Sequence, residues 1–380
     1  MSLQLPPLSL YVHIPWCVRK CPYCDFNSHA QRDELPEAEY IQCLLDDLES
    51  EKHLAQGRSI QTIFIGGGTP SLFSADSFKV LLQGINNIIP LEKNAEITLE
   101  ANPGTFEQDK FVGYRDAGIN RLSIGVQSFN DQHLAKLGRI HNSDNALKAA
   151  TLARELFPKL NLDLMHGLPD QTLEGALSDL EQAIALQPDH LSWYQLTIEP
   201  NTEFHSRPPL LPIDDTLWEI QEQGQALIRS AGYSQYEISA YAKSNESQAK
   251  HNLNYWQFGD YLGIGAGAHG KITLPEQNKI IRRWKQKQPK AYINPETRLT
   301  GDTEISPEEL PFEFMLNALR LYHGVPSNLF TERTGLPLSI IEQSLVKAQQ
   351  QKLLTKELHT LCPTEQGRCF LNNLLGFFMH

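Results

Sequence analysis

The sequence has few cysteines, no long apolar run and no excess of basic residues. Only 6 of its 380 residues are cysteine, which is too few for a secreted scaffold held by disulfides. No apolar stretch reaches the roughly 18 residues that a membrane-spanning helix needs, so we expect no membrane span. Lys and Arg number 33 against 45 Asp and Glu. This balance argues against a nucleic-acid-binding protein, because phosphate recognition needs a basic surface.

We expect no export signal at the amino end. Met1 to Pro7 lacks both the charged segment and the apolar segment that a secretory signal needs. Half of the cysteines fall between Cys17 and Cys24, and such clustering in a chain otherwise poor in cysteine is typical of metal binding in a reducing compartment. The sequence therefore predicts a cytoplasmic protein.

From Leu8 to about residue 230 the chain alternates short β-rich runs with longer amphipathic stretches, which is the pattern of βα units around a parallel sheet. The predicted strands are Leu8 to Ile14, Thr62 to Ile65, Glu96 to Glu100, Arg121 to Val126, Leu160 to Met165 and His190 to Ile198. The predicted helices are Pro36 to Gln56, Ala75 to Ile89, Phe106 to Ala117, Asn145 to Leu156, Leu173 to Leu186 and Thr216 to Ala231.

Six βα units with right-handed crossovers predict an α/β fold in the form of a partial (β/α)6 barrel, similar to three quarters of a TIM barrel. A doubly wound open sheet is the alternative. The barrel is favoured because nearly every predicted strand ends in polar or glycine residues. A site at the C-terminal mouth of a barrel requires such residues there.

The composition changes after the βα region. Gly259 to Gly270 is rich in glycine and is expected to form a strand with tight turns. A short basic stretch over 282–290 is expected to be solvated surface. Thr300 to Pro311 is rich in Asp, Glu and Pro, and helical patterns follow it. We therefore expect a core of residues 1–300, which includes the strand and glycine-rich extension, and a small α-rich domain of residues 301–380.

Three cysteines follow the first predicted strand in one short loop, Cys17-x3-Cys21-x2-Cys24. Structural zinc normally takes four protein ligands, whereas three thiolates on a [4Fe-4S] cluster leave one iron open to a further ligand. We therefore predict a cluster. The alternatives are three unrelated thiols or a zinc site completed by His13, Asp25 or His29. The other cysteines are expected to be small buried hydrophobic residues, and they are Cys43, Cys362 and Cys369.

The cysteine triplet and the His13-Ile14-Pro15-Trp16 run before it resemble the signature of the radical SAM superfamily. Members of that superfamily bind S-adenosylmethionine at the open iron of a [4Fe-4S] cluster, and the cofactor carries the radical chemistry. The resemblance extends over most of the chain and is closest to the coproporphyrinogen-oxidase-like branch. The further motifs that carry it are Gly66-Gly67-Gly68-Thr69-Pro70, Glu100-Ala101-Asn102-Pro103, Gly125 to Phe129, Gly138-Arg139 and Asp163 to Pro169.

By this resemblance, the three cysteines ligate the cluster and nine further residues contact S-adenosylmethionine. The nine are Tyr11, Tyr23, Gly67, Gly68, Thr69, Glu100, Gln127, Arg139 and Asp163. The chemistry is reasonable, since carboxylates accept hydrogen bonds from ribose hydroxyls or an amino group, and an arginine pairs with a carboxylate. The alternative for Glu100 and Asp163 is a buried salt bridge at the barrel mouth.

One departure from the oxidase pattern bears on function. The oxygen-independent coproporphyrinogen oxidases have a further cysteine two places after the third, whereas this chain has Cys24-Asp25-Phe26. The Cys-Asp-Phe ending and the motif His251-Asn252-x-x-Tyr255-Trp256 resemble a group of haem chaperones in the same branch. The resemblance implies that His251 ligates haem iron and that Tyr255 and Trp256 contact the macrocycle.

Two classes of function follow. The first is a haem chaperone that delivers haem to acceptor haemoproteins. The second is an enzyme that acts on a porphyrin, such as an oxygen-independent coproporphyrinogen III oxidase, and a zinc-stabilised scaffold is a third possibility. The predicted partners are haem, acceptor haemoproteins and, if the cofactor is cleaved, an electron donor. Peripheral membrane contact is compatible with the sequence, as is either a monomer or a homodimer.

Overall fold

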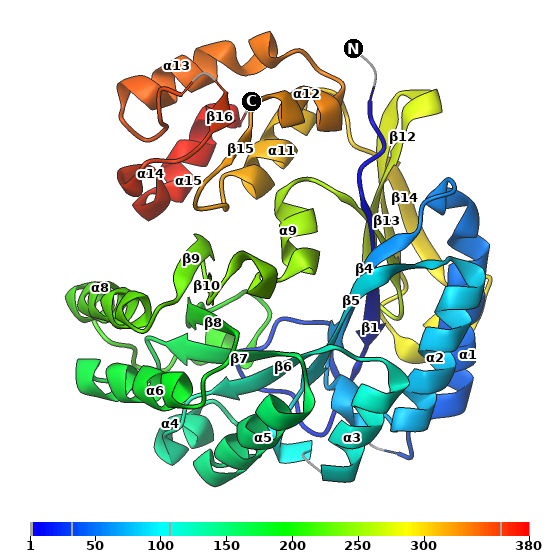
Figure 1. Ribbon diagram of the computed structural model, residues 1–380, viewed down its shortest axis with the longest axis vertical. Helices are drawn as coiled ribbons and strands as arrows, with labels where there is room; N and C mark the ends of the chain where they lie inside the picture. The colour runs from blue at the N-terminus through cyan, green and yellow to red at the C-terminus, as the bar shows by residue number, and fades with distance from the viewer. Residues whose placement is uncertain (1–2, 32, 106–107, 358, 380) are drawn as a thin grey trace.

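A computed structural model describes residues 3–31, 33–105, 108–357 and 359–379 (Figure 1). Its main sheet has twelve strands in the order β14-β13-β12-β11-β1-β4-β5-β6-β7-β8-β10-β9. Six strands that follow one another in the chain are neighbours in this sheet and pair in parallel. They are β1 (Leu8–Ile14), β4 (Ile60–Gly67), β5 (Leu91–Ala101), β6 (Arg121–Gln127), β7 (Lys159–His166) and β8 (His190–Gln195).

Helices follow these strands in the chain and lie on one side of the sheet (Figure 1). They are α1 (Glu37–Glu51), α2 (Ala75–Ile88), α3 (Gln108–Ala117), α5 (Ser143–Leu156), α6 (Leu173–Ala185) and α8 (Asp214–Ser230). The start predicted for the third helix, Phe106, lies outside the described residues. A strand order that never reverses is the order of a barrel, whereas a doubly wound sheet reverses at its first strand. The partial barrel is therefore confirmed.

The two faces of the parallel strands differ in polarity. In β7, Leu160, Leu162 and Leu164 are fully buried against the helices, whereas Asn161 and Asp163 alternate with them and face the inside of the barrel. Burying each leucine stabilises the fold by roughly 2 kcal/mol relative to exposure. Branched apolar side chains usually fill a TIM barrel, so polar inward positions leave room for a site.

Side-chain caps begin several of the covering helices. The Thr172 hydroxyl accepts a hydrogen bond from the Gly175 N–H at the start of α6, and the Ser74 hydroxyl caps α2 in the same way. Asn142 and Asn145 form a reciprocal capping box at α5. Each cap satisfies N–H groups that a helix leaves free and contributes about 1 kcal/mol.

The sheet continues beyond β1 through the glycine-rich region. Strand β11 (Asp260–Ile264) pairs in parallel with β1, and β12 (His269–Leu274), β13 (Lys279–Lys285) and β14 (Leu299–Glu304) follow in antiparallel order. At the other edge, β10 (Ala240–Ala242) pairs antiparallel with β8, and β9 (Ser234–Glu237) pairs antiparallel with β10.

The interpretation of 282–290 as solvated surface is wrong for Lys285. This residue lies in β13 and is 3% exposed. Its ammonium group donates to Asp47 Oδ1 at 2.6 Å and also to Glu51, both of which are on α1. A buried cation needs such partners. These two ion pairs join the sheet extension to α1.

The end of the chain forms a second hydrophobic core. It contains α11 (Leu310–Ala318), α12 (Asn328–Thr334), α13 (Glu342–Gln350), α14 (Glu365–Cys369), α15 (Leu371–Leu375) and the paired strands β15 (Val325–Pro326) and β16 (Thr360–Leu361). Phe314 and Phe330 are fully buried there. Leu3, Phe258 and Ile280 belong to the same core, so it also involves residues before 300. The division at residue 300 stays a prediction. Within the described part of the chain, no helix is both long and apolar enough to cross a membrane.

Candidate functional site

The C-terminal ends of the parallel strands surround a cavity of about 600 Å³, which we call the cysteine cavity. Its walls include Cys17, Cys21 and Cys24. Eight of the nine residues predicted to contact S-adenosylmethionine also line it: Tyr23, Gly67, Gly68, Thr69, Glu100, Gln127, Arg139 and Asp163. Tyr11, the ninth, lines a neighbouring cavity instead. The structure therefore brings together strand ends that are far apart in the sequence.

Backbone hydrogen bonds fix the cysteine loop to the end of β4. The Gly68 N–H donates to the Ile14 carbonyl and the Thr69 N–H donates to the Trp16 carbonyl, both at 2.7 Å. Within the loop, the Cys24 N–H donates to the Cys21 carbonyl at 3.1 Å. The position of the thiols therefore depends on the glycine-rich strand end.

Gly67 and Gly68 have no room for a side chain. A Cβ on Gly67 would lie 2.4 Å from Cε1 of His13, and its φ of +112° also favours glycine. A Cβ on Gly68 would lie 2.5 Å from the Trp16 carbonyl oxygen. The glycines thus let the cysteine loop and the strand end approach each other, in addition to lining the cavity.

Arg139 joins the loop to the opposite wall. Its Nη1 donates to Cys21 Sγ at 3.8 Å and its Nη2 donates to the Gly125 carbonyl at 2.7 Å. Nε of this arginine is buried without a hydrogen-bond partner in the described residues. Burial raises the pKa of Tyr23, although Arg139 acts in the opposite direction. The guanidinium therefore places positive charge beside one of the three sulfurs.

Glu100 and Asp163 lie in the walls without ion-pair partners among the described residues, so the alternative of a buried salt bridge is not what the structure shows. Glu100 Oε2 accepts the Gly67 N–H at 3.1 Å, and Asp163 accepts Ser123 Oγ–H at 2.9 Å and Asn161 Nδ2–H at 2.8 Å. Burial, together with the charge of Asp163, raises the pKa of Glu100 to about 8. Burial also raises the pKa of Asp163.

This shift predicts a pH dependence of stability. In the cluster-free protein, the folded state keeps the Glu100 proton up to about pH 8, while the unfolded chain releases it near the ordinary pKa of 4.5. The free energy of unfolding should therefore fall as the pH rises through that window. We expect Glu100→Gln to remove on the order of 2 kcal/mol of this fall between about pH 5 and about pH 8.

Urea denaturation at a series of pH values measures how steeply the free energy of unfolding falls with pH. Glu92→Gln, which changes an exposed glutamate of the same strand, is the matched control and should leave the slope as it is. If the free energy of unfolding fell equally steeply with pH in Glu100→Gln and in the unchanged protein, the raised pKa of Glu100 would be contradicted.

Gln127 is held in an unusual backbone conformation. Its φ is +68° and its side chain is 6% exposed, and its Oε1 accepts the Tyr194 O–H at 2.9 Å. Tyr194 and Ser192 line the cavity, although the sequence reasoning did not select them. They are at alternate positions of β8, and that spacing on an inward-facing strand is the signal by which they could have been found.

A second cavity of about 650 Å³ adjoins the first, and we call it the aromatic cavity. Seven aromatic residues line it: Tyr11, Phe26, Phe64, Tyr255, Trp256, Phe258 and Tyr261. Tyr255 and Trp256 are at the end of α9 (Lys250–Trp256). The two cavities share a wall made of Asp25, Phe26, Gly67, Glu100 and Trp256. The segment after Cys24 therefore separates them.

His251 does not line either cavity. It is 1% exposed, and both ring nitrogens are hydrogen-bonded. The Thr62 hydroxyl donates to Ser9 Oγ at 2.8 Å, so His251 Nδ1–H donates to Thr62 at 2.7 Å and Nε2 accepts the Tyr255 O–H at 2.8 Å. Burial lowers the pKa of His251 to about 3. In this arrangement the imidazole is neutral and positions Tyr255.

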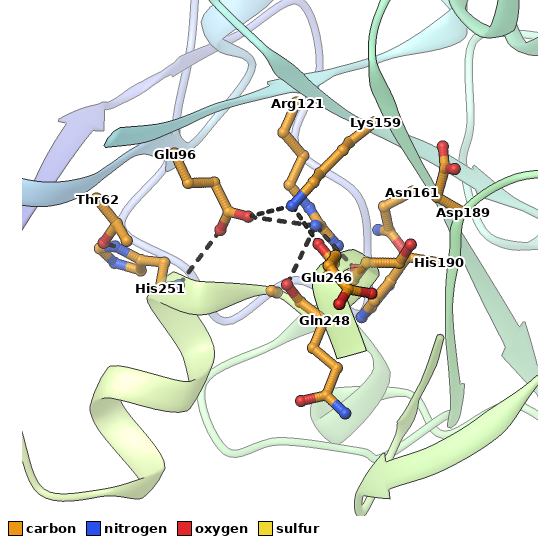
Figure 2. A network of polar contacts seen from close by, with 12 residues as sticks. Thr62, Glu96, Arg121, Lys159, Asn161, Asp189, His190, Glu246, Gln248 and His251 are labelled. Carbon is orange, nitrogen blue, oxygen red and sulfur yellow. Dashed lines mark hydrogen bonds and ion pairs between the residues drawn. The ribbon is translucent and has the colours of Figure 1, made fainter. Parts of the chain in front are cut away.

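A polar network inside the barrel holds the start of α9 (Figure 2). Glu96 accepts the His251 N–H at 3.4 Å and pairs with Arg121 at 3.4 Å and Lys159 at 3.7 Å. Arg121 in turn donates to the Ser247 carbonyl at 3.0 Å. Arg121 and Glu96 are 2% and 4% exposed. Side chains of β5, β6 and β7 thus fix the position of α9, and with it the position of Tyr255 and Trp256.

The zinc alternative fits the structure poorly. His13 Nδ1 accepts the Tyr11 O–H at 2.9 Å, and Nε2–H donates to the Asn27 carbonyl at 2.8 Å, so neither nitrogen is open to a metal. Across the described ranges, no group of three His, Cys, Asp or Glu side chains is arranged to hold a single metal ion. A [4Fe-4S] cluster differs, because each thiolate ligates its own iron.

The thiols themselves fit a cluster. Cys17, Cys21 and Cys24 are free and partly exposed, they open on one cavity, and soft sulfur ligands suit iron–sulfur chemistry. Of the remaining cysteines, Cys43 is buried, Cys362 is partly exposed and Cys369 is exposed, so the expectation of burial is confirmed only for Cys43. Cys369 is the last residue of α14.

Comparisons with known proteins agree with this geometry. The profile of the radical SAM superfamily matches residues 11–181, and that of the HemN C-terminal domain matches residues 305–370. The heme chaperone HemW of Escherichia coli (strain K12) is 54% identical over 378 residues, and that of Haemophilus influenzae is 55% identical over 381 residues, with 99% of each chain covered in both cases. The solved structure of coproporphyrinogen III oxidase (HemN) from E. coli superposes with a TM-score of 0.83 at 23% identity, over 98% of this chain and 90% of that one.

A three-cysteine loop against a glycine-rich strand end, at the mouth of six parallel βα units, defines a radical SAM protein. This superfamily uses a [4Fe-4S] cluster and S-adenosylmethionine. Within it, the chain belongs to the family of the heme chaperone HemW. The likeness to the oxidase structure shows the fold alone.

Proposed function

We propose that this protein is a haem chaperone, which binds haem and delivers it to acceptor haemoproteins. The observation that carries the proposal is the aromatic cavity beside the cysteine cavity. A volume of about 650 Å³ is within the usual range of ligand pockets, and aromatic walls suit a flat apolar macrocycle. The names of the full-length relatives support the same function.

Trp256 carries a donor, unpaired among the described residues, in the wall of the cavity. Its Nε1–H is buried without a hydrogen-bond partner in the part of the chain described, and the residue lies in the wall between the two cavities. Arg320 stacks over its ring at 4.3 Å. A buried donor without a partner costs about 1–3 kcal/mol, so an acceptor atom on a bound ligand would stabilise the complex.

We further propose the roles of the residues around the cysteine cavity. Cys17, Cys21 and Cys24 hold the cluster, which supplies an open iron site and an electron when it is bound. Tyr23, Gly67, Gly68, Thr69, Gln127 and Asp163 position S-adenosylmethionine, together with Glu100 and Arg139. Glu100 and Asp163 accept hydrogen bonds from its hydroxyl or amino groups, and Arg139 pairs with its carboxylate. Tyr11 orients His13 at the boundary of the aromatic cavity.

Phe26 is the reason to prefer a carrier over an oxidase. This side chain is 57% exposed in the wall between the cavities and replaces the extra thiol of the oxidase pattern. Conversion of coproporphyrinogen to protoporphyrinogen with consumption of S-adenosylmethionine would contradict the proposal.

A haem titration tests the function. After anaerobic reconstitution of the cluster, we expect stoichiometric haem uptake, followed by absorbance. Trp256→Ala and Tyr255→Ala should each weaken uptake about tenfold or more, because they remove the wall that the macrocycle contacts. Trp218→Ala removes an exposed tryptophan on α8, outside both cavities, and should bind haem as the unchanged protein does. No uptake by the unchanged protein would refute the function.

The remaining assignments complete the proposal. We place the protein in the cytoplasm, with peripheral membrane contact where acceptor proteins are membrane-bound, and as a monomer or homodimer. An electron donor is required only if S-adenosylmethionine is cleaved. Tyr255 and Trp256 contact haem. The assignment of His251 as the ligand of the haem iron stays a prediction. In the present arrangement both nitrogens of that ring are hydrogen-bonded, so neither is open to the iron.

A further inference from the structure

An axial ligand of the haem iron would be a side chain that reaches the iron from the cavity wall. Histidine, tyrosine, lysine, methionine and cysteine can do this. Several wall residues of these types are already committed. His13 uses both ring nitrogens, and the Lys271 ammonium pairs with Asp260 at 3.2 Å and is 2% exposed. The hydroxyl groups of Tyr11 and Tyr255 donate to His13 and His251.

His269 is different from these residues. It lines the aromatic cavity at the start of β12 and is exposed. No hydrogen bond to its ring is formed by the residues that the structure describes, and the ring stacks on Trp284 with centroids 6.3 Å apart and an interplanar angle of 22°. Desolvation, with Lys287 and Arg282 nearby, lowers the pKa of His269. The imidazole is therefore neutral near neutral pH, which is the form that ligates metals.

The surroundings of His269 also suit the edge of a haem. Arg282 and Lys287 line the same cavity. Lys287 is exposed, and Arg282 is paired with Glu313 and with the Tyr261 hydroxyl. These two cations complement the propionate carboxylates of a haem, although the carboxyl groups of Asp25 and Glu100 also line the cavity.

We propose that His269 is the axial ligand of the haem iron in the aromatic cavity, while His251 acts indirectly by positioning Tyr255. This inference rests on the proposed function. It assigns the coordinating atom to a ring that faces the cavity, and it assigns a supporting role to the buried ring in the His251-Asn252-x-x-Tyr255-Trp256 motif.

The test uses the full chain with its cluster reconstituted anaerobically, and two probes, haem and metal-free protoporphyrin IX. In His269→Gly the affinity for haem should fall by about tenfold or more, and the absorbance band of the histidine-ligated iron should be lost. Free imidazole should restore that band, because it supplies the missing ligand. Protoporphyrin IX has no iron to ligate, so its affinity should change by less than about twofold.

Two control variants separate ligation from structure. His323→Gly alters an exposed histidine outside both cavities and should behave as the unchanged protein does. His251→Ala should lower the affinity for haem and for protoporphyrin IX equally, since it releases Tyr255. It should keep the absorbance band of the bound haem.

The inference is overturned if His269→Gly keeps the band, or if His251→Ala loses the band and free imidazole restores it there. In either case the unchanged protein still takes up haem, so the chaperone function survives. Absence of haem uptake by the unchanged protein refutes the function itself, and the ligand assignment with it.

Discussion

Replacing Cys17, Cys21 and Cys24 together with serine is expected to reduce bound iron and sulfide to background. The three thiols open on one cavity, and a serine hydroxyl does not form the soft anionic ligand that an iron–sulfur cluster needs. Iron and acid-labile sulfide, measured after anaerobic reconstitution, give the result directly, and the visible absorbance of the cluster should disappear with them.

The matched control is Cys369→Ser. This cysteine is exposed and outside both cavities, so its replacement should leave iron and sulfide unchanged. Iron and sulfide retained by the triple variant would mean that other residues hold the cluster, and the assignment of the cysteine cavity would then be wrong.

Glu96→Ala is expected to lower the free energy of unfolding by about 3–5 kcal/mol, because it leaves a buried arginine without its counter-charge. Arg121 is 2% exposed and Glu96 is its carboxylate partner. The same variant removes the acceptor of the His251 N–H at the start of α9. Urea denaturation of the cluster-free protein measures the loss.

Glu49→Ala provides the comparison on the surface. Glu49 pairs with Lys52 at 3.5 Å, and both side chains are more than half exposed. Such a pair contributes about 0–1 kcal/mol, so this variant should unfold at nearly the same urea concentration as the unchanged protein. A loss below about 1 kcal/mol for Glu96→Ala would show that the network does not hold α9 in the way described.

The βα units could be predicted because each carries its own signal. Leu160, Leu162 and Leu164 alternate with polar residues, so β7 was evident from the chain alone. Strand ends were harder to predict. Strand β5 begins at Leu91, five residues before the predicted start, because Leu91 pairs with Ile60 although Glu92, Lys93 and Asn94 resemble a loop.

The parts that sequence reasoning missed depend on contacts between distant segments. Lys285 is buried only because Asp47 and Glu51 approach it from a helix near the other end of the chain. For His251, residue type alone favoured a hydrogen-bonded core histidine and the family resemblance implied a haem ligand, but neither identified Thr62 and Tyr255 as the partners of its two nitrogens. Local pattern does not specify such partners. The cysteine cavity was predictable, by contrast, because strand ends of a barrel meet at one mouth.

The anchoring of α9 has a consequence for the thermodynamics of binding. The Tyr255 hydroxyl is held by His251, and its ring meets Tyr261 edge-on with centroids 4.5 Å apart. Immobilising a flexible side chain on association costs about 0.5–1.5 kcal/mol. Because folding has already restricted this tyrosine, little of that entropy remains to be lost when a ligand enters, and the wall keeps its shape after the ligand leaves.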